Sequence, residues 1–233
     1  MMSGCIEKTT SLRTIGLFGG SFNPIHEGHV RLAHALCRAG IVDEVWFMVS
    51  PLNPFKQKGE HAGMLEGNYS DRVEMARLAI GEYPQLRVST FEASLPRPSY
   101  TWNTMQALAK AYPQCTFVLM MGQDNWAQFD AWYHAQDLLA NYDMIVYDRL
   151  SREPSVSSQS PSEGVRLWSH SKHTLQPIES AEPFPLFQVS STDVRQAFAT
   201  ANQPFLDTWV APAVQAYCRQ HALYLAQQTN GEL

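Results

Sequence analysis

The chain has 233 residues, a formal net charge of −5 and a charged fraction of only 17%. This length suits a domain with a substantial apolar core, and the hydrophobic content of 45% excludes wholesale disorder. The acidic balance argues against a broad grip on nucleic acid, which requires a basic face. It does not argue against a small cluster of cations around one anionic ligand.

Cysteine usage and hydropathy indicate a cytoplasmic protein. Cys5, Cys37, Cys115 and Cys218 are scattered and form no CxxC pair, which favours reduced thiols over a disulfide framework or a zinc site. Residues 1–13 contain no apolar signal segment, and no apolar run approaches the roughly 18 residues that a membrane helix needs. We expect no membrane partner, and the sequence leaves homo-oligomer formation open.

Short, β-rich apolar runs alternate with helical stretches along the chain. They predict strands at Ile15–Phe18, Val45–Val49, Leu86–Thr90, Thr116–Met121 and Met144–Tyr147, with a weaker one at Phe187–Val189. Helices are expected at about 28–39, 70–81, 102–111, 134–140, 193–199 and 211–221. The alternation, with strands apolar on both faces, predicts an α/β fold built on a doubly wound, open parallel sheet.

The expected domain covers residues 14–225, between an N-terminal extension (1–13) and a C-terminal tail (226–233). Two segments have the composition of loops: Pro51–Gly67, and residues 151–164, which are dense in Ser and Pro and are interpreted as a surface insertion. Ligands of such folds bind beyond the carboxyl ends of the strands. Chemistry is therefore expected in the segments that follow the strands.

The first predicted strand runs directly into GGSFNPIHEGH, which covers residues 19–29. The two glycines let the backbone approach a ligand, and a helix that begins near Gly28 directs unpaired N–H groups to the same place. His26 and His29 share one face of such a helical turn. Zinc is disfavoured, because the HExxH spacing is absent and no third ligand stands nearby. We interpret the pair as a phosphate contact, and expect no metal site built from protein ligands.

A hydroxyl-rich turn lies near the other end of the chain. Ser190, Ser191 and Thr192 can cap a helix, and Asp193 suits its first turn. Arg195 in that turn opposes the helix dipole, which suggests a functional role. Hydroxyls, N–H groups and a guanidinium together would hold a polyphosphate. Taken alone, the segment is equally compatible with an ordinary capped helix; beside the His pair, the polyphosphate interpretation is favoured.

These two segments carry a resemblance to a known superfamily. Gly19–His29 resembles the HxGH signature, and Val189–Arg195 the ISSTxxR motif, of the adenylyltransferase branch of the class I aminoacyl-tRNA-synthetase-like nucleotidyltransferases. Over residues 14–225 the chain resembles bacterial nicotinate-nucleotide adenylyltransferase. Further segments that carry this likeness are Ser50–Lys56, Asp71–Met75, Glu92 with Ser99–Thr104, Gly122–Asp124 with Phe129 and Trp132–Tyr133, and Val210–Val214 with Tyr217, Leu223 and Tyr224. Phe55 stands where that family usually has His, so the role of that His is not carried over.

The resemblance implies a Rossmann-like nucleotidyltransferase fold. It also implies that ATP and nicotinate mononucleotide react to give deamido-NAD and pyrophosphate, a step of NAD biosynthesis. His26, His29 and Arg195 are implied to be catalytic, and Mg²⁺ is expected to bridge the phosphate oxygens with few protein ligands. The implied ATP-binding residues are Gly19, Gly20, Ser21, Phe22, His26, His29, Gly122, Asp124, Ser190, Ser191, Thr192 and Arg195.

The implied mononucleotide-binding residues are Asn53, Lys56, Arg72, Tyr100, Thr101, Trp132 and Arg149. Trp132 can stack on the pyridine ring, and the helix that opens at Tyr100–Thr101 can offer N–H groups to its carboxylate. Arg149 follows the fifth strand and suits the mononucleotide phosphate. Taken singly, Trp132 also fits a core position, and Lys56 and Arg72 fit solvated surface positions. Their convergence after strand ends favours the functional interpretation.

Three alternatives stay open. Another HxGH adenylyl- or cytidylyltransferase, such as phosphopantetheine adenylyltransferase, is disfavoured by the SYT and GxD…W segments and by the greater length. A tRNA-binding, synthetase-like module is disfavoured by the acidic balance and the lack of a basic stripe. A non-catalytic nucleotide-binding module is disfavoured by the intact His pair and Arg195. The sequence does not decide between nicotinate and nicotinamide mononucleotide.

Overall fold

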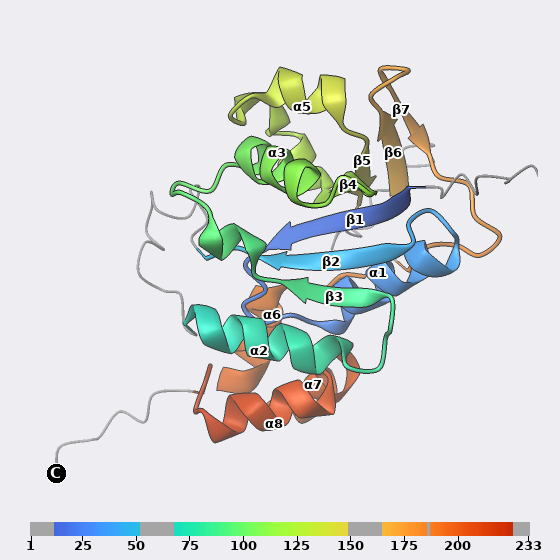
Figure 1. Cartoon of the computed structure of the whole chain (residues 1–233). Coiled ribbons are helices and arrows are strands. Elements are labelled where there is room, and N and C mark those ends of the chain that lie inside the picture. The colour runs from blue at the N-terminus through green and yellow to red at the C-terminus, as the bar shows by residue number, and fades with distance from the viewer. Residues whose placement is uncertain (1–11, 52–67, 149–164, 186, 226–233) are drawn as a thin grey trace, which may run out of the picture.

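A computed structural model gives the structure of residues 12–51, 68–148, 165–185 and 187–225. Seven strands of this part of the chain form one sheet, in the order β3-β2-β1-β4-β5-β6-β7, with helices on both faces (Figure 1). The strands are β1 (Arg13–Gly20), β2 (Glu44–Val49), β3 (Leu86–Ser89), β4 (Cys115–Gly122), β5 (Met144–Tyr147), β6 (Val165–Ser169) and β7 (Thr174–Pro177). Residues 1–11 of the expected extension (1–13), and the expected segments 151–164 and 226–233, lie outside the described residues, so the domain bounds stay a prediction.

Strands β1 to β5 are parallel, which confirms the doubly wound α/β architecture. β1 lies between β2 and β4, and the middle of β1 and all of β5 are buried. Burial from both faces is the reason that these strands read as nearly continuous apolar runs. Their carboxyl ends lie at one edge of the sheet, on the left of Figure 1 where the arrowheads of β1, β2 and β3 point.

The edge of the sheet formed by β6 and β7 differs from the expectation. β6 pairs antiparallel with β5, and β7 pairs antiparallel with β6, so the sheet is mixed rather than wholly parallel. Both strands are short, mostly half-buried or exposed, and carry polar residues, which removes the apolar signal. The expected strand at Phe187–Val189 is wrong, because this segment runs outside the sheet.

Six predicted helices are present, each within two residues of its expected bounds. They are α1 (Glu27–Arg38), α2 (Tyr69–Ile80), α3 (Thr101–Ala111), α5 (Ala135–Asn141), α6 (Ser191–Ala199) and α8 (Pro212–Gln220). The sequence did not predict α4 (Gln123–Trp126), α7 (Gln203–Trp209), or the 3₁₀ turns at Phe91–Ser94 and Phe129–Ala131. At three to seven residues, these elements are too short for a helical period to stand out.

Each face of the sheet carries its own core. On one face, α3 and α5 cover a cluster that includes Ile15 and Leu17 of β1. On the other, α1, α2, α6 and α8 cover a larger cluster that includes Phe18 (Figure 1). In the part of the chain that the structure describes, no helix is both long and apolar enough to cross a membrane.

The amino-terminal edge of the sheet holds a charge cluster of its own. The buried Glu44 carboxylate accepts hydrogen bonds from Arg13 at 2.6 Å, from Arg87 Nε at 2.8 Å and from Trp46 Nε1 at 3.0 Å. A buried carboxylate with three donors is well satisfied. These two arginines therefore serve the fold at the edge opposite to the one where ligands bind.

Candidate active site

The loop between β1 and α1 is held in a fixed shape by aromatic packing. Phe22 adopts a left-handed φ of +46°, and its ring is buried 5.4 Å from Phe47 and 5.2 Å from the ring of His29. A Cβ on Gly20 would lie 2.9 Å from the Phe22 ring, so only glycine fits there. A Cβ on Gly19 would meet no atom within 4 Å, so the end of β1 faces open space.

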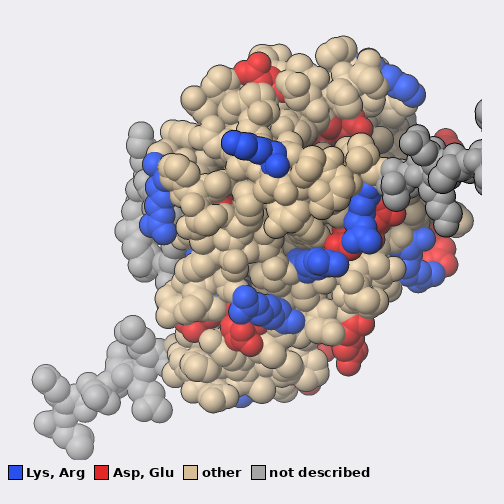
Figure 2. Space-filling view, viewed as in Figure 1, with Lys and Arg blue, Asp and Glu red and all other residues tan. Residues whose placement is uncertain are grey.

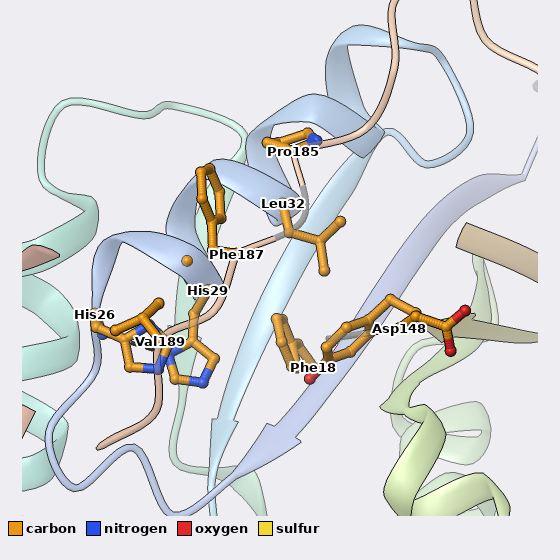
Figure 3. A pocket seen from close by; sticks show the side chains of 10 residues that line it. Phe18, His26, His29, Leu32, Asp148, Pro185, Phe187 and Val189 are labelled. Atoms are coloured by element: carbon orange, nitrogen blue, oxygen red, sulfur yellow. Dashed lines mark hydrogen bonds between the residues drawn. The ribbon is translucent and has the colours of Figure 1, made fainter. Parts of the chain in front are cut away.

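His26 and His29 lie together at the start of α1 (Figure 3). Their rings stack with centroids 3.7 Å apart, and His26 is only 6% exposed. The backbone N–H of His26 donates to His29 Nδ1 at 3.3 Å. Because a neutral imidazole whose Nδ1 accepts a hydrogen bond carries its proton on Nε2, this bond makes Nε2 the donor of His29.

Gly28, between the two histidines, allows the second motif to approach α1. A Cβ on Gly28 would lie 2.9 Å from Val189 Cγ1 and 3.1 Å from His26 Nδ1. Both distances are shorter than normal van der Waals contacts, so any side chain would push the two segments apart. The HxGH pattern thus has a packing reason as well as a chemical one: its glycine brings residues 189–195 next to the His pair.

The second motif begins with the helix cap that the sequence predicts. Ser190 is the N-cap of α6; its Oγ accepts from the Asp193 N–H at 3.2 Å, and the Asp193 carboxylate accepts from the Ser190 N–H at 2.9 Å. This reciprocal capping box places the hydroxyl-rich turn at a helix N-terminus. Such a terminus offers unpaired N–H groups and a favourable dipole to an anion.

Two side chains of α6 bind the β1–α1 loop directly. Ser191 Oγ donates to the Pro24 carbonyl at 2.9 Å. Arg195 donates through Nη1 to the Asn23 carbonyl at 2.7 Å and through Nη2 to Thr192 Oγ1 at 3.0 Å. These contacts explain why Arg195 lies in the first turn of α6, where its positive charge opposes the helix dipole. The two motifs, which lie far apart in the sequence, form one structural unit.

A small pocket opens beside this unit (Figure 3). The two imidazoles lie at one end of it and Asp148 on the opposite side. Its walls between these ends are largely apolar, formed by Phe18, Leu32, Pro185, Phe187 and Val189 among others. Apolar walls with polar groups at the ends suit a flat heterocycle that carries phosphates.

Arg72 lies buried between the loops that follow β1 and β2. Its side chain is only 2% exposed, and its guanidinium donates to the carbonyls of Ser21 at 2.7 Å, Ser50 at 2.9 Å and Pro51 at 3.4 Å. Burial lowers the pKa of this guanidinium, and the carbonyl acceptors compensate for its lost hydration. Arg72 thus ties together the loops that follow β1 and β2, and its expected contact with the mononucleotide stays a prediction.

A buried carboxylate connects the β2 loop to α3. Glu92 is 8% exposed and accepts from Thr104 Oγ1 of α3 at 3.2 Å. Desolvation by burial raises the pKa of Glu92, and hydrogen bonds from Ser50 and Thr104 oppose that shift. This places the first turn of α3, where the predicted residues Tyr100 and Thr101 lie, in a fixed relation to the ends of β2 and β3.

The aromatic residues near α3 divide into a half-buried and an exposed group. Trp132 is half-buried, with its ring 5.2 Å from Phe129. The next residue, Tyr133, is 49% exposed and stacks on Tyr100 with centroids 4.5 Å apart. The Tyr100–Tyr133 pair is thus an exposed flat surface beside the α3 N-terminus. The sequence contained Tyr133 within a motif, but its position alone assigned it no role.

The GxD segment begins α4 at the carboxyl end of β4. A Cβ on Gly122 would overlap the Asp124 carboxylate, which explains the glycine. Beside this turn, the Arg166 guanidinium donates to Asp148 Oδ1 at 3.2 Å and to Gln123 Oε1. Sequence reasoning missed Arg166, because the strand that carries it was not predicted.

Three predicted mononucleotide-binding residues, Asn53, Lys56 and Arg149, lie outside the described residues, as does Phe55. Their contribution stays a prediction. Within the described ranges, no group of three or more His, Cys, Asp or Glu residues could hold a metal ion. On the face shown in Figure 2, blue and red side chains are scattered among tan ones and form no continuous basic stripe.

Comparisons with known proteins show the family to which the chain belongs. A cytidylyltransferase-like family model matches residues 17–197. A "Probable nicotinate-nucleotide adenylyltransferase" of Bacteroides fragilis is 40% identical over 187 residues, which cover 79% of this chain and 82% of the relative. The protein of the same name from Bacteroides thetaiotaomicron is 39% identical over 215 residues, 91% of this chain and 96% of the relative.

A solved structure also shares the fold. It is the Plasmodium falciparum nicotinic acid mononucleotide adenylyltransferase complexed with NaAD, which matches with a TM-score of 0.64 at 17% identity, over 91% of this chain and 97% of that one. This likeness agrees with the expected Rossmann-like nucleotidyltransferase fold. From the family match and the close sequence relatives together, the chain belongs to the cytidylyltransferase-like family and, within it, to the nicotinate-nucleotide adenylyltransferases.

Proposed function

We propose that this chain transfers the adenylyl group of ATP to nicotinate mononucleotide, which yields deamido-NAD and pyrophosphate. One observation carries the proposal: the Ser190–Arg195 turn binds the loop that leads into the stacked His26–His29 pair, and the two imidazoles line a pocket. The close relatives, which share most of their length with this chain, bear the name of that reaction. The fold and the site support the same chemistry.

The reaction is an in-line displacement at phosphorus. A phosphate oxygen of the mononucleotide attacks the α-phosphorus of ATP, the new P–O bond forms, and the bond to the bridging oxygen of the β-phosphate breaks. Pyrophosphate leaves with that oxygen. Since the nucleophile is already an anion near neutral pH, no catalytic base is needed. The barrier lies in bringing two polyanions together, so alignment and charge neutralisation supply the catalysis.

His29 Nε2–H is proposed to stabilise the charge on the α-phosphate, with His26 beside it on the ATP phosphates. The backbone of Gly19 to Phe22 would allow close approach of the nucleotide. The Ser190–Thr192 turn and Arg195 would hold the β- and γ-phosphates that leave. Arg195 has five N–H donors, so its bond to the Asn23 carbonyl leaves donors for phosphate oxygens.

Gly122 and Asp124 are proposed to contact the ribose or adenine side of ATP. Mg²⁺ would arrive on the ATP phosphates and reduce their negative charge. The described residues fit that arrangement, because imidazoles, hydroxyls and a guanidinium bind phosphate oxygens rather than a bare cation. The cytoplasmic location expected from the sequence stays a prediction.

On the mononucleotide side, the N–H groups at Tyr100–Thr101 would take the pyridine carboxylate, and Trp132 would stack on the ring. Lys56, Asn53 and Arg149 remain the proposed contacts of its ribose phosphate. Arg72 stays in this proposed set; in the structure its guanidinium donates to backbone carbonyls of the loops that follow β1 and β2.

Replacing Trp132 by alanine is expected to raise KM for the mononucleotide about 10-fold, since stacking of a base on an aromatic ring contributes ~1–3 kcal/mol. KM for ATP should change little. Trp126→Ala is the matched control, because the Trp126 ring packs against the same Phe129 at 5.5 Å. Steady-state kinetics with each substrate varied in turn measure both constants. Equal increases in the two KM values, or the same pattern in Trp126→Ala, would contradict the stacking role.

The overall proposal is tested by ATP-dependent pyrophosphate release, with nicotinate mononucleotide, nicotinamide mononucleotide and phosphopantetheine in parallel reactions. We expect release with nicotinate mononucleotide, and formation of deamido-NAD in equal amount. Release only with phosphopantetheine would identify a different adenylyltransferase. No release with any acceptor would favour a nucleotide-binding module.

A further inference from the structure

The end of the described chain returns to the loop that carries the His pair. After α8, left-handed residues at Ala222 (φ +52°) and Tyr224 (φ +62°) turn the backbone inward. The Tyr224 side chain is 4% exposed, and its hydroxyl donates to Asn23 Oδ1 at 2.5 Å. Its ring lies 5.9 Å from Phe198 of α6. Tyr224 therefore contacts both halves of the phosphate site.

Asn23 is the point where these contacts meet. It is 5% exposed, its side-chain oxygen accepts from Tyr224, and its backbone carbonyl accepts from Arg195 at 2.7 Å. On either side of it, the Pro24 carbonyl accepts from Ser191, and the Ser21 carbonyl accepts from Arg72. Side chains from α2, α6 and the C-terminal segment thus fix consecutive parts of the loop that leads into His26.

The donor in this contact is stable. Burial raises the pKa of the Tyr224 hydroxyl well above its ordinary value, so the group stays protonated over the whole range in which enzymes are assayed. An amide oxygen buried without its donor would carry an uncompensated desolvation cost. The loop would relieve that cost by moving Asn23, and with it the carbonyl that anchors Arg195.

We infer that Tyr224 is a positioning residue for adenylyl transfer. Through Asn23 it fixes the positions of the His pair and Arg195 relative to each other. Tyr224 touches no reacting atom; its hydroxyl sets the place of Asn23, and Asn23 sets the distance between the β1–α1 loop and α6. This inference rests on the proposed function. Small displacements of aligned groups reduce the rate of in-line chemistry far more than they reduce binding.

The chain offers a matched control in Tyr217 of α8. Its hydroxyl also donates to a side chain, Asp71 Oδ1 at 2.9 Å, but that partner lies on α2 rather than in the loop. Tyr217→Phe and Tyr224→Phe each remove one hydroxyl from the same C-terminal segment. A difference between them reports what the Asn23 contact adds.

We expect Tyr224→Phe to lower kcat for pyrophosphate release about 10-fold, with KM for ATP within about 3-fold of the wild type, because a misalignment of about 1 Å costs up to ~10²-fold in rate. Tyr217→Phe should keep kcat within about 2-fold. In a double-variant cycle, Tyr224→Phe combined with Asn23→Leu should be no slower than the slower single variant. Equal kcat values for the two Tyr variants, or additive losses in the cycle, would overturn the inference.

Amide hydrogen exchange provides a readout that is independent of turnover and of whether Asn23→Leu folds. Peptides that cover residues 21–29 should exchange faster in Tyr224→Phe than in the wild type and in Tyr217→Phe. Unchanged exchange there would overturn the positioning role. A wild-type chain that releases no pyrophosphate would instead contradict the proposed function, and the exchange result would still test the contact.

Discussion

Replacing His29 by alanine is expected to lower kcat about 10²–10³-fold, the usual loss when one preorganised donor to developing charge is removed. The structure gives the physical reason. His29 Nδ1 accepts from the His26 backbone N–H, which leaves the Nε2–H of the ring as the proposed donor to the α-phosphate. Pyrophosphate release at saturating ATP and mononucleotide measures kcat, and thermal unfolding shows whether the variant is folded.

Two variants separate the chemical role of His29 from its place in the helix. His29→Asn keeps a side-chain acceptor near the position of Nδ1 but has no donor at the position of Nε2, so it should fold normally and stay slow. His34→Ala changes the next histidine of α1, whose ring lies tilted at 4.8 Å from that of Tyr83, and should keep kcat. Turnover of His29→Ala within 3-fold of the wild type would refute the assignment.

Replacing Arg195 by methionine is expected to lower kcat/KM for ATP by about 10²-fold, since a hydrogen bond to a charged group contributes ~1.5–3 kcal/mol. Two roles are lost together: the anchor on the Asn23 carbonyl and the donors to the leaving phosphates. Arg195→Lys keeps the charge without the planar fork, and should recover only part of the loss.

Arg38→Met is a suitable control for this variant. Arg38 ends α1 and its side chain is 61% exposed, so its loss removes a positive charge without touching the site. Kinetics at several salt concentrations would show whether overall charge matters. An Arg195→Met variant with the kcat/KM of Arg38→Met would contradict a direct phosphate role.

How far the fold was predictable depends on burial. β1, β4 and β5 are buried from both faces, so their apolar runs were visible, and capping residues such as Ser190 marked a helix start. β6 and β7 form an antiparallel hairpin at the edge of the sheet, and most of their residues are half-buried or exposed. Their sequences therefore lack the apolar pattern that would distinguish these strands from a loop.

In the candidate site, too, local features were predictable from the sequence and long-range contacts were not. His26 and His29 share a helix face through their spacing alone, so local geometry was sufficient to pair them. Arg72 belongs to an ordinary-looking helix turn, and its burial depends on two loops that only the assembled sheet brings to it. Tyr224 belonged to a family-like tail segment, but its contact with Asn23 gave no signal, because Asn23 lies at the other end of the chain.

The chain has an acidic composition and is nonetheless proposed to bind an anionic ligand. The structure shows how these two properties are compatible. Arg13 and Arg87 neutralise Glu44 at one edge of the sheet, whereas Arg195 and the His pair lie at the other. The sequence by itself determined the parallel core, the phosphate-binding spacing and the family, since these depend on neighbours in the chain. Only the tertiary structure decided which cations neutralise a buried carboxylate and which bind the backbone beside the His pair. Contacts such as Gly28 to Val189 and Tyr224 to Asn23 form after the sheet is assembled, when residues distant in the chain become neighbours.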